Sequence, residues 1–336
     1  MFMKNVSIGV FAHNEARNCA QILDALLCQE CRQIKIIEIL VISSASTDGT
    51  DEIVEFIADS NPIIRLIQEP VRQGKAAAIN KYLAAKHQDA DICVIASADI
   101  IPDRQAVERL ALPLSDSQVG MTGGRPIPVN KGDNFLGFVV QLQWKLHHSI
   151  SLRHPKCGEM IAFRSDLAQS IPIESPVDEA SLEAIAAHKS LKLKYVPEAT
   201  FINRGPDTLE DFISQRRRIA SGHRWLRETE GYRVATGSSW EVMRALVSQP
   251  PHRLIEWIWT MGAIGLEFLC RVFGLLDFYF QPRRHQVWRI VESTKQSFLA
   301  EEIAGVRHAT MLAQNEESSW MLIPELHGDA IKHHVH

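Results

Sequence analysis

The chain has 336 residues, of which 46% are hydrophobic and 23% charged, and its formal net charge is −4. This composition excludes a disordered or collagen-like chain, and the length suits one large α/β domain with an additional region. The acidic balance argues against bulk electrostatic binding of nucleic acid, so we expect no nucleic-acid partner. The 6 cysteines are scattered and form no disulfide framework. Because no signal peptide or N-terminal anchor is recognised, we expect a reducing, cytoplasmic location.

The first hundred residues alternate between strand patterns and helix patterns. Strands are predicted at 6–12, 36–42, 63–67 and 91–96, and helices at 16–27, 50–59 and 75–86. The short connections between them are typical of a parallel sheet with helices on its faces. In such sheets ligands bind beyond the carboxyl ends of the strands. We therefore expect the polar turns that follow these strands to form one site.

Polar turns follow all four predicted strands, at 13–15, 43–50, 72–75 and 97–99. No GxGxxG follows the first strand, and neither GxxxxGK[ST] nor GxSxG occurs in the chain. These absences argue against a dinucleotide-dependent dehydrogenase, a P-loop NTPase and an α/β-hydrolase.

Three charged residues in these turns are candidates to contact a phosphorylated ligand or its metal ion. Asp99 lies just past a buried strand, where its carboxylate could bind Mg²⁺ or Mn²⁺ or could cap a helix. Lys75 follows Gly74 at a helix start, where backbone N–H groups and an ammonium favour phosphate, and its alternative is a solvated position. Asp48 precedes helix 50–59 and could contact a nucleoside or cap that helix.

At these turns the sequence resembles the family 2 glycosyltransferases of the GT-A fold. Six short pieces match the family's motifs in order, over roughly residues 4–225. They are the NE turn at 14–15, VISSASTDGT at 41–50 (family VVDDGSTDGT), QGKAAAIN at 73–80 (GKxxAxN), SAD at 97–99 (DxD), DEASL at 178–182 (EDxxL) and QRRRI at 215–219 (QxxRW). Each match alone is weak evidence for the resemblance, but six matches in this order are strong evidence.

The resemblance implies a mixed sheet flanked by helices and an inverting, Mn²⁺- or Mg²⁺-dependent transfer. The sugar would pass from a nucleotide-diphosphate sugar, with UDP favoured over GDP, to a hydroxyl of a glycan or lipid-linked acceptor. Asp99 would be the metal ligand, and Asp178 or Glu179 the base. Because the Asp-Glu order here reverses the family's Glu-Asp, the choice of base stays open. The implied donor-binding residues are Asn14, Glu15, Ser44, Asp48, Lys75, Ser97, Gln215 and Arg218.

Three departures from the family pattern qualify these assignments. Ser97 replaces the first Asp of DxD, and 43–44 is a serine pair where the family has two acids that hold the nucleobase. A serine hydroxyl can still bind a hydroxyl of the donor, so the activity is retained in this interpretation. Ile219 replaces the family's Trp, which weakens the expectation of a processive polymer synthase.

The chain is divided at residue 230 in this interpretation. Residues 1–230 form the catalytic domain, and 231–336 form a helical C-terminal extension with an apolar segment at 254–280. Four charged residues make a membrane span by this segment costly, although Glu267 and Arg271 could pair at i, i+4. With aromatic flanks and basic residues at 283–289, it favours an interfacial helix at the inner face of a membrane, by which the protein is peripheral or anchored. The alternative is a helix packed on the catalytic domain or on a second copy in a homo-oligomer.

Two other functions compete with glycosyl transfer. A sugar-1-phosphate nucleotidyltransferase should have a glycine-rich, basic loop after the first strand, and residues 13–17 are not one. A noncatalytic nucleotide-sugar-binding or scaffold protein would account for the serines at 43, 44 and 97. Metal-dependent turnover of a donor would exclude the scaffold.

Overall fold

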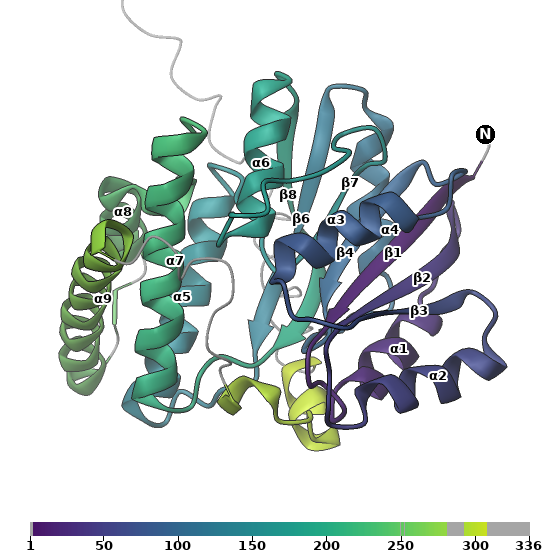
Figure 1. The fold of residues 1–336 in the computed structure, drawn as a ribbon. Helices are drawn as coiled ribbons and strands as arrows, with labels where there is room; N and C mark the ends of the chain where they lie inside the picture. Colours follow the sequence, from purple (N-terminus) through teal and green to yellow (C-terminus); the bar gives the residue numbers. More distant parts are fainter. Residues whose placement is uncertain (1–2, 249, 252, 281–291, 308–336) are drawn as a thin grey trace, which may run out of the picture. The chain divides into compact units, whose positions relative to one another are not determined.

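The computed structural model describes residues 3–248, 250–251, 253–280 and 292–307 (Figure 1). The described residues up to Ser297 form one compact unit, and those from Phe298 belong to a second. In the second unit, residues 300–307 are helical. The first unit contains the sheet and the site.

The described residues contain one eight-stranded mixed sheet in the order β3-β2-β1-β4-β7-β6-β8-β5. Strands β1 to β4 are parallel where they pair, whereas β7 is antiparallel to both β4 and β6. Strand β8 is parallel to β6 and antiparallel to β5. The strands are β1 Lys4–Ala12, β2 Ile34–Ser44, β3 Ile64–Glu69, β4 Ile92–Ser97, β5 Ile101–Pro102, β6 Val119–Pro128, β7 Met160–Arg164 and β8 Lys192–Asn203. The predicted mixed sheet is confirmed.

Helices cover both faces of this sheet and extend beyond one side of it (Figure 1). The α-helices are α1 Cys19–Leu27, α2 Thr50–Ser60, α3 Lys75–Ala85, α4 Ala106–Ala111, α5 Phe135–Ser151, α6 Asp178–His188, α7 Leu209–Thr229, α8 Ser239–Ser248 and α9 Leu254–Phe280. Short 3₁₀ segments are η1 Leu112–Ser115, η2 Ala235–Gly237 and η4 Glu292–Lys295. In the first hundred residues, every predicted strand and helix is present, with ends shifted by three residues at most.

Alternating side chains of the parallel strands enter two separate cores. Val6, Ile8 and Val10 of β1 pack with the apolar sides of α1, α2 and α4, while Phe11 packs with α3 and α6. Burial on both faces explains why β1 and β2 read as nearly continuous apolar runs. Gly9 lies under the ring of Tyr82, where a Cβ would come within 2.8 Å of a ring carbon.

The strand register places the predicted polar turns at one edge. Ala12 pairs with Ser43, Phe11 pairs with Ser97, and Ser44 pairs with Glu69. The carboxyl ends of four parallel strands therefore stop at the same level. Because β7 runs antiparallel to β4, its amino end reaches this edge as well, with Met160 opposite Ala96.

The C-terminal helices lie against α5 and α7 on the side away from the sheet (Figure 1). Helix α9 approaches α7 closely at Gly274, where a Cβ would lie 2.7 Å from the Cβ of Ala220. The predicted pair of Glu267 with Arg271 is confirmed at 2.8 Å. No helix within the described ranges is long and apolar enough to cross a membrane. The basic stretch 283–289 lies outside the described residues.

Candidate functional site

Lys75 joins three of the sequence motifs at the carboxyl edge of the sheet. Its ammonium, at the first residue of α3, donates a hydrogen bond to Ser97 Oγ at 3.0 Å and pairs with the carboxylate of Glu179. Gly74 precedes it with a φ of 97°, a conformation that glycine adopts without strain. Burial alone would lower the pKa of Lys75, but the charges of Glu179 and Asp178 raise it. Lys75 is therefore a half-buried cation between the end of β4 and the start of α6.

Asp178 and Glu179 are adjacent at the start of α6 but differ in proton affinity. Asp178 is buried, and burial together with the Glu179 charge raises its pKa to about 7. Burial would also raise the pKa of Glu179, yet its contacts with Lys75 lower it. Two neighbouring carboxyl groups with pKa values pushed apart are the arrangement expected of an acid or base beside a fixed anion.

Two further carboxyl groups lie at the same edge. Burial raises the pKa of Asp99, and the charge of Lys75 offsets this only in part. Glu159, directly before β7, has its pKa raised to about 7 by burial and by the charge of Asp99. Its Oε2 accepts a hydrogen bond from Asn203 Nδ2 at 2.8 Å. Sequence reasoning missed Glu159, although an acid next to a buried strand was the signal that led to Asp99.

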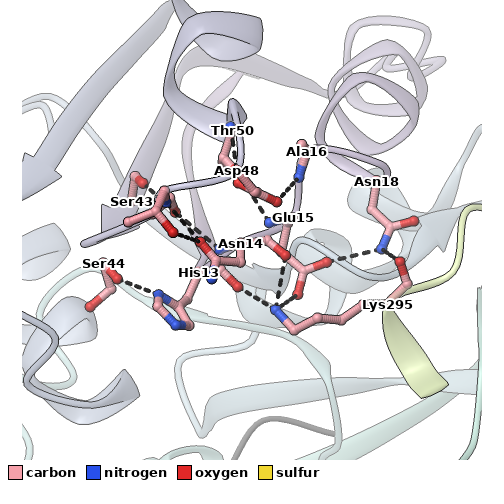
Figure 2. Close-up of polar contacts among 12 residues, drawn as sticks. His13, Asn14, Glu15, Ala16, Asn18, Ser43, Ser44, Asp48, Thr50 and Lys295 are labelled. Carbon is pink, nitrogen blue, oxygen red and sulfur yellow. Dashed lines mark hydrogen bonds and ion pairs between the residues drawn. The ribbon is translucent and has the colours of Figure 1, made fainter. Parts of the chain in front are cut away.

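The turn after β1 is locked to the turn after β2 (Figure 2). Asn14 has a φ of 53°, and its Oδ1 accepts a hydrogen bond from the Thr47 N–H at 2.8 Å. His13 Nδ1 lies 2.6 Å from the carbonyl oxygen of Ser44, and burial lowers the pKa of this histidine. Asn14 thus bridges two turns within the protein.

Asp48 ties the same two turns together by both carboxylate oxygens (Figure 2). Oδ1 accepts from the Thr50 N–H at 3.1 Å and from the Thr50 hydroxyl, and Oδ2 accepts from the Ala16 N–H at 3.0 Å. Burial would raise the pKa of Asp48, but these hydrogen bonds outweigh it and lower the pKa. The structure therefore gives Asp48 the capping contacts that the sequence left as one of two alternatives.

The serine pair at the end of β2 is also hydrogen-bonded within the protein. Ser43 Oγ donates to Ser46 Oγ at 2.9 Å, and Ser44 Oγ donates to the buried carboxylate of Glu69 at 2.8 Å. Glu69, at the end of β3, therefore places an acid one strand away from the position of the family's two acids. Each serine hydroxyl keeps lone pairs that can accept a hydrogen bond.

Lys295, from the end of the first unit, reaches into the turn after β1 (Figure 2). Its ammonium pairs with Glu15 Oε1 at 2.7 Å and donates to the carbonyl oxygens of His13 and Asn14. Its charge also lowers the pKa of Asp99, although burial keeps that pKa raised. Burial and the charge of Asp99 raise the pKa of Glu15 to about 7 despite the pair with Lys295. Sequence reasoning missed Lys295 because no motif surrounds it.

Helix α7 supplies cations to two different places. The charge of Arg218 lowers the pKa values of Asp99 and Asp178, so Arg218 lies near the carboxyl edge, and Gln215 lies one turn before it. Arg216 and Arg217 instead pair with Glu267 and Asp277 of α9 at 2.8 and 2.7 Å. The arginine run thus divides between the site and the contact with α9.

Asp99 is the candidate ligand for a divalent cation at the carboxyl edge of the sheet. Within the described residues, no three His, Cys, Asp or Glu side chains are placed to hold a metal by themselves. The pKa of Asp99 is nevertheless raised, because the neighbouring positive charges only partly offset the effect of burial. Mg²⁺ and similar cations commonly bind through one or two carboxylates plus substrate phosphates. The residues therefore fit a cation that arrives together with a diphosphate.

Comparisons with known proteins agree with this geometry. Residues 7–165 match glycosyl transferase family 2. The chain is 29% identical over 119 residues to glycosyltransferase AglE of Haloferax volcanii, covering 35% of this chain and 38% of that protein. It is 24% identical over 243 residues to the probable glycosyltransferase YdaM of Bacillus subtilis, covering 67% of this chain and 56% of that protein. Each match thus spans less than two thirds of the relative's length.

A solved structure shows the same fold. Mannosyltransferase PcManGT of Pyrobaculum calidifontis, in complex with GDP-Man and Mn²⁺, superposes with a TM-score of 0.56 at 19% identity, covering 83% of this chain and 88% of that chain. The GT-A fold predicted from the motifs is thereby confirmed. Residues 7–165 of this chain therefore match glycosyl transferase family 2, and the chain has the fold of a solved mannosyltransferase.

Proposed function

We propose that the protein transfers a sugar, with inversion, from a nucleoside-diphosphate sugar to an acceptor hydroxyl. The observation that carries this proposal is the position of Lys75, whose ammonium contacts Ser97 beside Asp99 and Glu179 beside Asp178. One cation thus links the residues assigned to the donor with those assigned to the acceptor. The matched relatives AglE and YdaM are named glycosyltransferases, which supports the same reaction class.

The leaving group in this reaction is a nucleoside diphosphate, whose growing charge must be stabilised. A divalent cation, Mn²⁺ or Mg²⁺, held by Asp99 and the diphosphate would supply most of that stabilisation. Arg218 and Lys75 add positive charge at the same edge, and Gln215 adds an amide donor. The relative PcManGT was solved with Mn²⁺ and GDP-Man, which supports a metal and a diphosphate donor in this fold.

Asp178 is the proposed base that takes the proton from the acceptor hydroxyl. A general base works best when its pKa lies near the working pH, and the pKa of Asp178 is about 7. Glu179 is instead held as an anion by Lys75 and would position that ammonium. The reversed Asp-Glu order of the sequence is thus matched by a division of roles between the two residues.

At the nucleoside end, the turns after β1 and β2 are proposed to hold the base and ribose. Asn14, Glu15, Ser44 and Asp48 are each held there by hydrogen bonds to neighbouring residues of the two turns or of β3, and Ser97 would bind a ribose hydroxyl. A UDP-sugar is favoured as donor, with a GDP-sugar as the alternative. The acceptor is proposed to be a glycan or a lipid-linked sugar at the inner face of a membrane.

The proposal is tested by nucleotide release from a panel of UDP- and GDP-sugars with Mn²⁺, Mg²⁺ or a chelator, with and without membrane lipid extract as acceptor. Metal-dependent release is expected from one donor, and Asp99→Asn is expected to lower it at least about 10³-fold. The matched control is Asp103→Asn, which removes a nearby carboxylate 3.8 Å from Arg109 and should change release less than about twofold.

Calorimetry of donor binding separates a missing acceptor from a missing activity. Binding of a UDP- or GDP-sugar that requires metal and Asp99 supports the transferase even when no acceptor turns over. Absence of metal-dependent binding and of release across the whole panel contradicts the proposal and favours the noncatalytic scaffold.

A further inference from the structure

Helix α9 carries its apolar side chains outward along its whole length. Leu254 at its start is 79% exposed, Phe268 near its middle 66%, and Phe280 at its end 76%. Helix α8 also exposes apolar side chains, with Trp240 and Val247 exposed by 72% and 73%. A helix on the surface of a globular protein normally turns its apolar stripe toward the core. We call this outward apolar surface of α8 and α9 the α8–α9 face.

Three of the four acidic side chains of these two helices bond toward the body of the protein, while the fourth, Glu256, accepts a hydrogen bond from the Arg253 N–H at the start of α9. Glu267 accepts two hydrogen bonds from Arg216 at 2.8 and 2.9 Å, and Asp277 accepts two from Arg217 at 2.7 and 3.0 Å. Glu241 of α8 is likewise bonded to the guanidinium of Arg153, in the turn after α5. The helices are therefore fixed by polar contacts on their inner side, and their outer side is left apolar.

The charged residues that are exposed on α8 and at the start of α9 are arginines. Arg244 of α8 is exposed, and so is Arg253 immediately before α9. Aromatic side chains lie near both ends of α9, with Trp257 and Tyr279 exposed by 51% and 57%. Apolar side chains with basic and aromatic residues at their margins are the pattern of a helix that lies in the plane of a lipid surface.

This charge pattern decides between a lipid surface and a second copy of the chain. In a two-fold contact the face would meet itself, and its arginines would meet few carboxylates on the facing copy, because three of the four acids of α8 and α9 are bonded inward. Anionic lipid headgroups supply the missing negative charge. At about 1.5 Å per residue, the 27 residues of α9 form a contact about 40 Å long.

We propose that the α8–α9 face is the surface by which this protein binds an anionic lipid bilayer, with α9 lying flat in the headgroup region. Helices α5 and α7 separate this face from the sheet (Figure 1). The proposal does not depend on the transferase reaction, because vesicle binding requires neither donor nor acceptor.

The test is flotation of the full chain with vesicles of phosphatidylcholine alone or with phosphatidylglycerol added. The protein is expected to float with the anionic vesicles, and Phe268→Glu is expected to lower the affinity at least about tenfold. The matched control is Phe56→Glu, which changes an equally apolar side chain, 79% exposed on α2, and should leave binding unchanged.

The arginines are tested separately from the apolar residues. Replacement of Arg244 and Arg253 by Gln should weaken binding to anionic vesicles by about fivefold for each arginine and leave binding to phosphatidylcholine alone unchanged. Failure of the unsubstituted protein to float, or equal flotation of the Phe268→Glu variant, would overturn the proposal. So would a dimer in sedimentation that Phe268→Glu dissociates in the absence of any vesicle binding, since a second copy would then cover the face.

Discussion

Two groups of carboxylates are partly or fully buried. One lies at the carboxyl edge of the sheet and the other between α7 and α9, and only the second group forms ion pairs with arginines. Burial raises the pKa values of Asp99, Glu159 and Asp178. Burial would raise the pKa of Glu267 too, yet Arg216 and Arg271 lower it. Asp277 is held by two hydrogen bonds from Arg217. The first group therefore carries repulsion that the second lacks.

This difference separates a site from a structural contact. Buried carboxylates that are fully paired hold two elements in one arrangement, and removal of one partner is costly. Buried carboxylates crowded together without enough cations are unfavourable for stability, and such clusters gather where a ligand completes the charge balance. The substitutions below are chosen because they should act in opposite directions on the two groups.

After Asp99→Asn, the largest effect is expected for Asp178→Asn. If Asp178 is the base, this change should lower kcat at least about 10²-fold, because it removes the proton acceptor. In the unsubstituted enzyme, kcat/KM should fall as the pH drops through about 7, where Asp178 becomes protonated. The pH–rate profiles of the two proteins are the measurement. Glu179→Gln, the matched variant, should retain an inflection but shift it below pH 7, because the Glu179 charge helps to raise the pKa of Asp178, and it should mainly raise KM for the donor.

Stability should change in the opposite sense. The folded-state pKa of Asp178 lies above its unfolded value of about 4. Its contribution to stability is therefore present at low pH and is lost as the pH rises from about 4 through about 7. Asp178→Asn removes this pH-dependent loss, so the variant should melt at the same temperature as the unsubstituted protein or higher at pH 8. A variant that is both inactive and clearly less stable at pH 8 would show that Asp178 has a structural role.

The next effect is expected for Arg217→Met at the contact between α7 and α9. This change leaves the buried Asp277 without its guanidinium partner, while the methionine keeps much of the apolar stem. The expected loss is about 2 kcal/mol of unfolding free energy, below the usual cost of breaking a buried pair because Arg217 is itself 38% exposed. Urea unfolding measures it. Arg104→Met, which breaks an exposed pair with Glu30, should cost less than about 0.5 kcal/mol.

A second substitution shows whether the loss comes from the unpaired charge. Arg217→Met combined with Asp277→Leu should recover most of the stability, since no buried carboxylate is then left alone. Equal losses for the Arg217→Met and Arg104→Met variants would mean that the ion pair contributes nothing to the contact, and the two groups of carboxylates would no longer differ in the way described above.

The positions of the turns on the proposed donor side were predictable from the sequence because their determinants are local. Each parallel strand is an apolar run, and each is followed by residues typical of turns and helix starts. Asp99 and Lys75 were found in this way, since the rule that ligands bind at the carboxyl ends of parallel strands applies to both. In the structure, Lys75 donates a hydrogen bond to Ser97, which ends β4 two residues before Asp99.

This rule does not identify Glu159, and the reason is the direction of its strand in the sheet. It precedes β7 rather than following it, and only the antiparallel pairing of β7 with β4 brings its amino end to the carboxyl edge. Strand direction in a mixed sheet is set by long-range pairing, which the local pattern does not contain. The pairs of Arg216 and Arg217 with α9 are likewise separated by 51 and 60 residues, whereas the i, i+4 pair of Glu267 and Arg271 was predictable.

The smallest effect is expected for Lys295, whose place in the site depends on a separation of about 280 residues from the turn it closes. Lys295→Met removes the ammonium on which Glu15 and the carbonyl oxygens of His13 and Asn14 converge. The Glu15 carboxylate is then left beside the charge of Asp99, so the turn after β1 should shift. We expect KM for the donor to rise about tenfold, equivalent to about 1.4 kcal/mol of binding, with a smaller change in kcat.

The comparison between the two carboxylate groups makes this last prediction specific, because Glu15 shares features of both. It is paired, like Glu267, yet its pKa is raised to about 7, like that of Asp178. If the unpaired carboxylate is what damages the Lys295→Met enzyme, adding Glu15→Gln should recover part of the lost donor affinity. Lys35→Met, an exposed lysine at the opposite end of β2, should leave KM unchanged. A Lys295→Met enzyme that binds the donor more tightly would contradict a supporting role and would mean that the ammonium competes with the donor for the same edge.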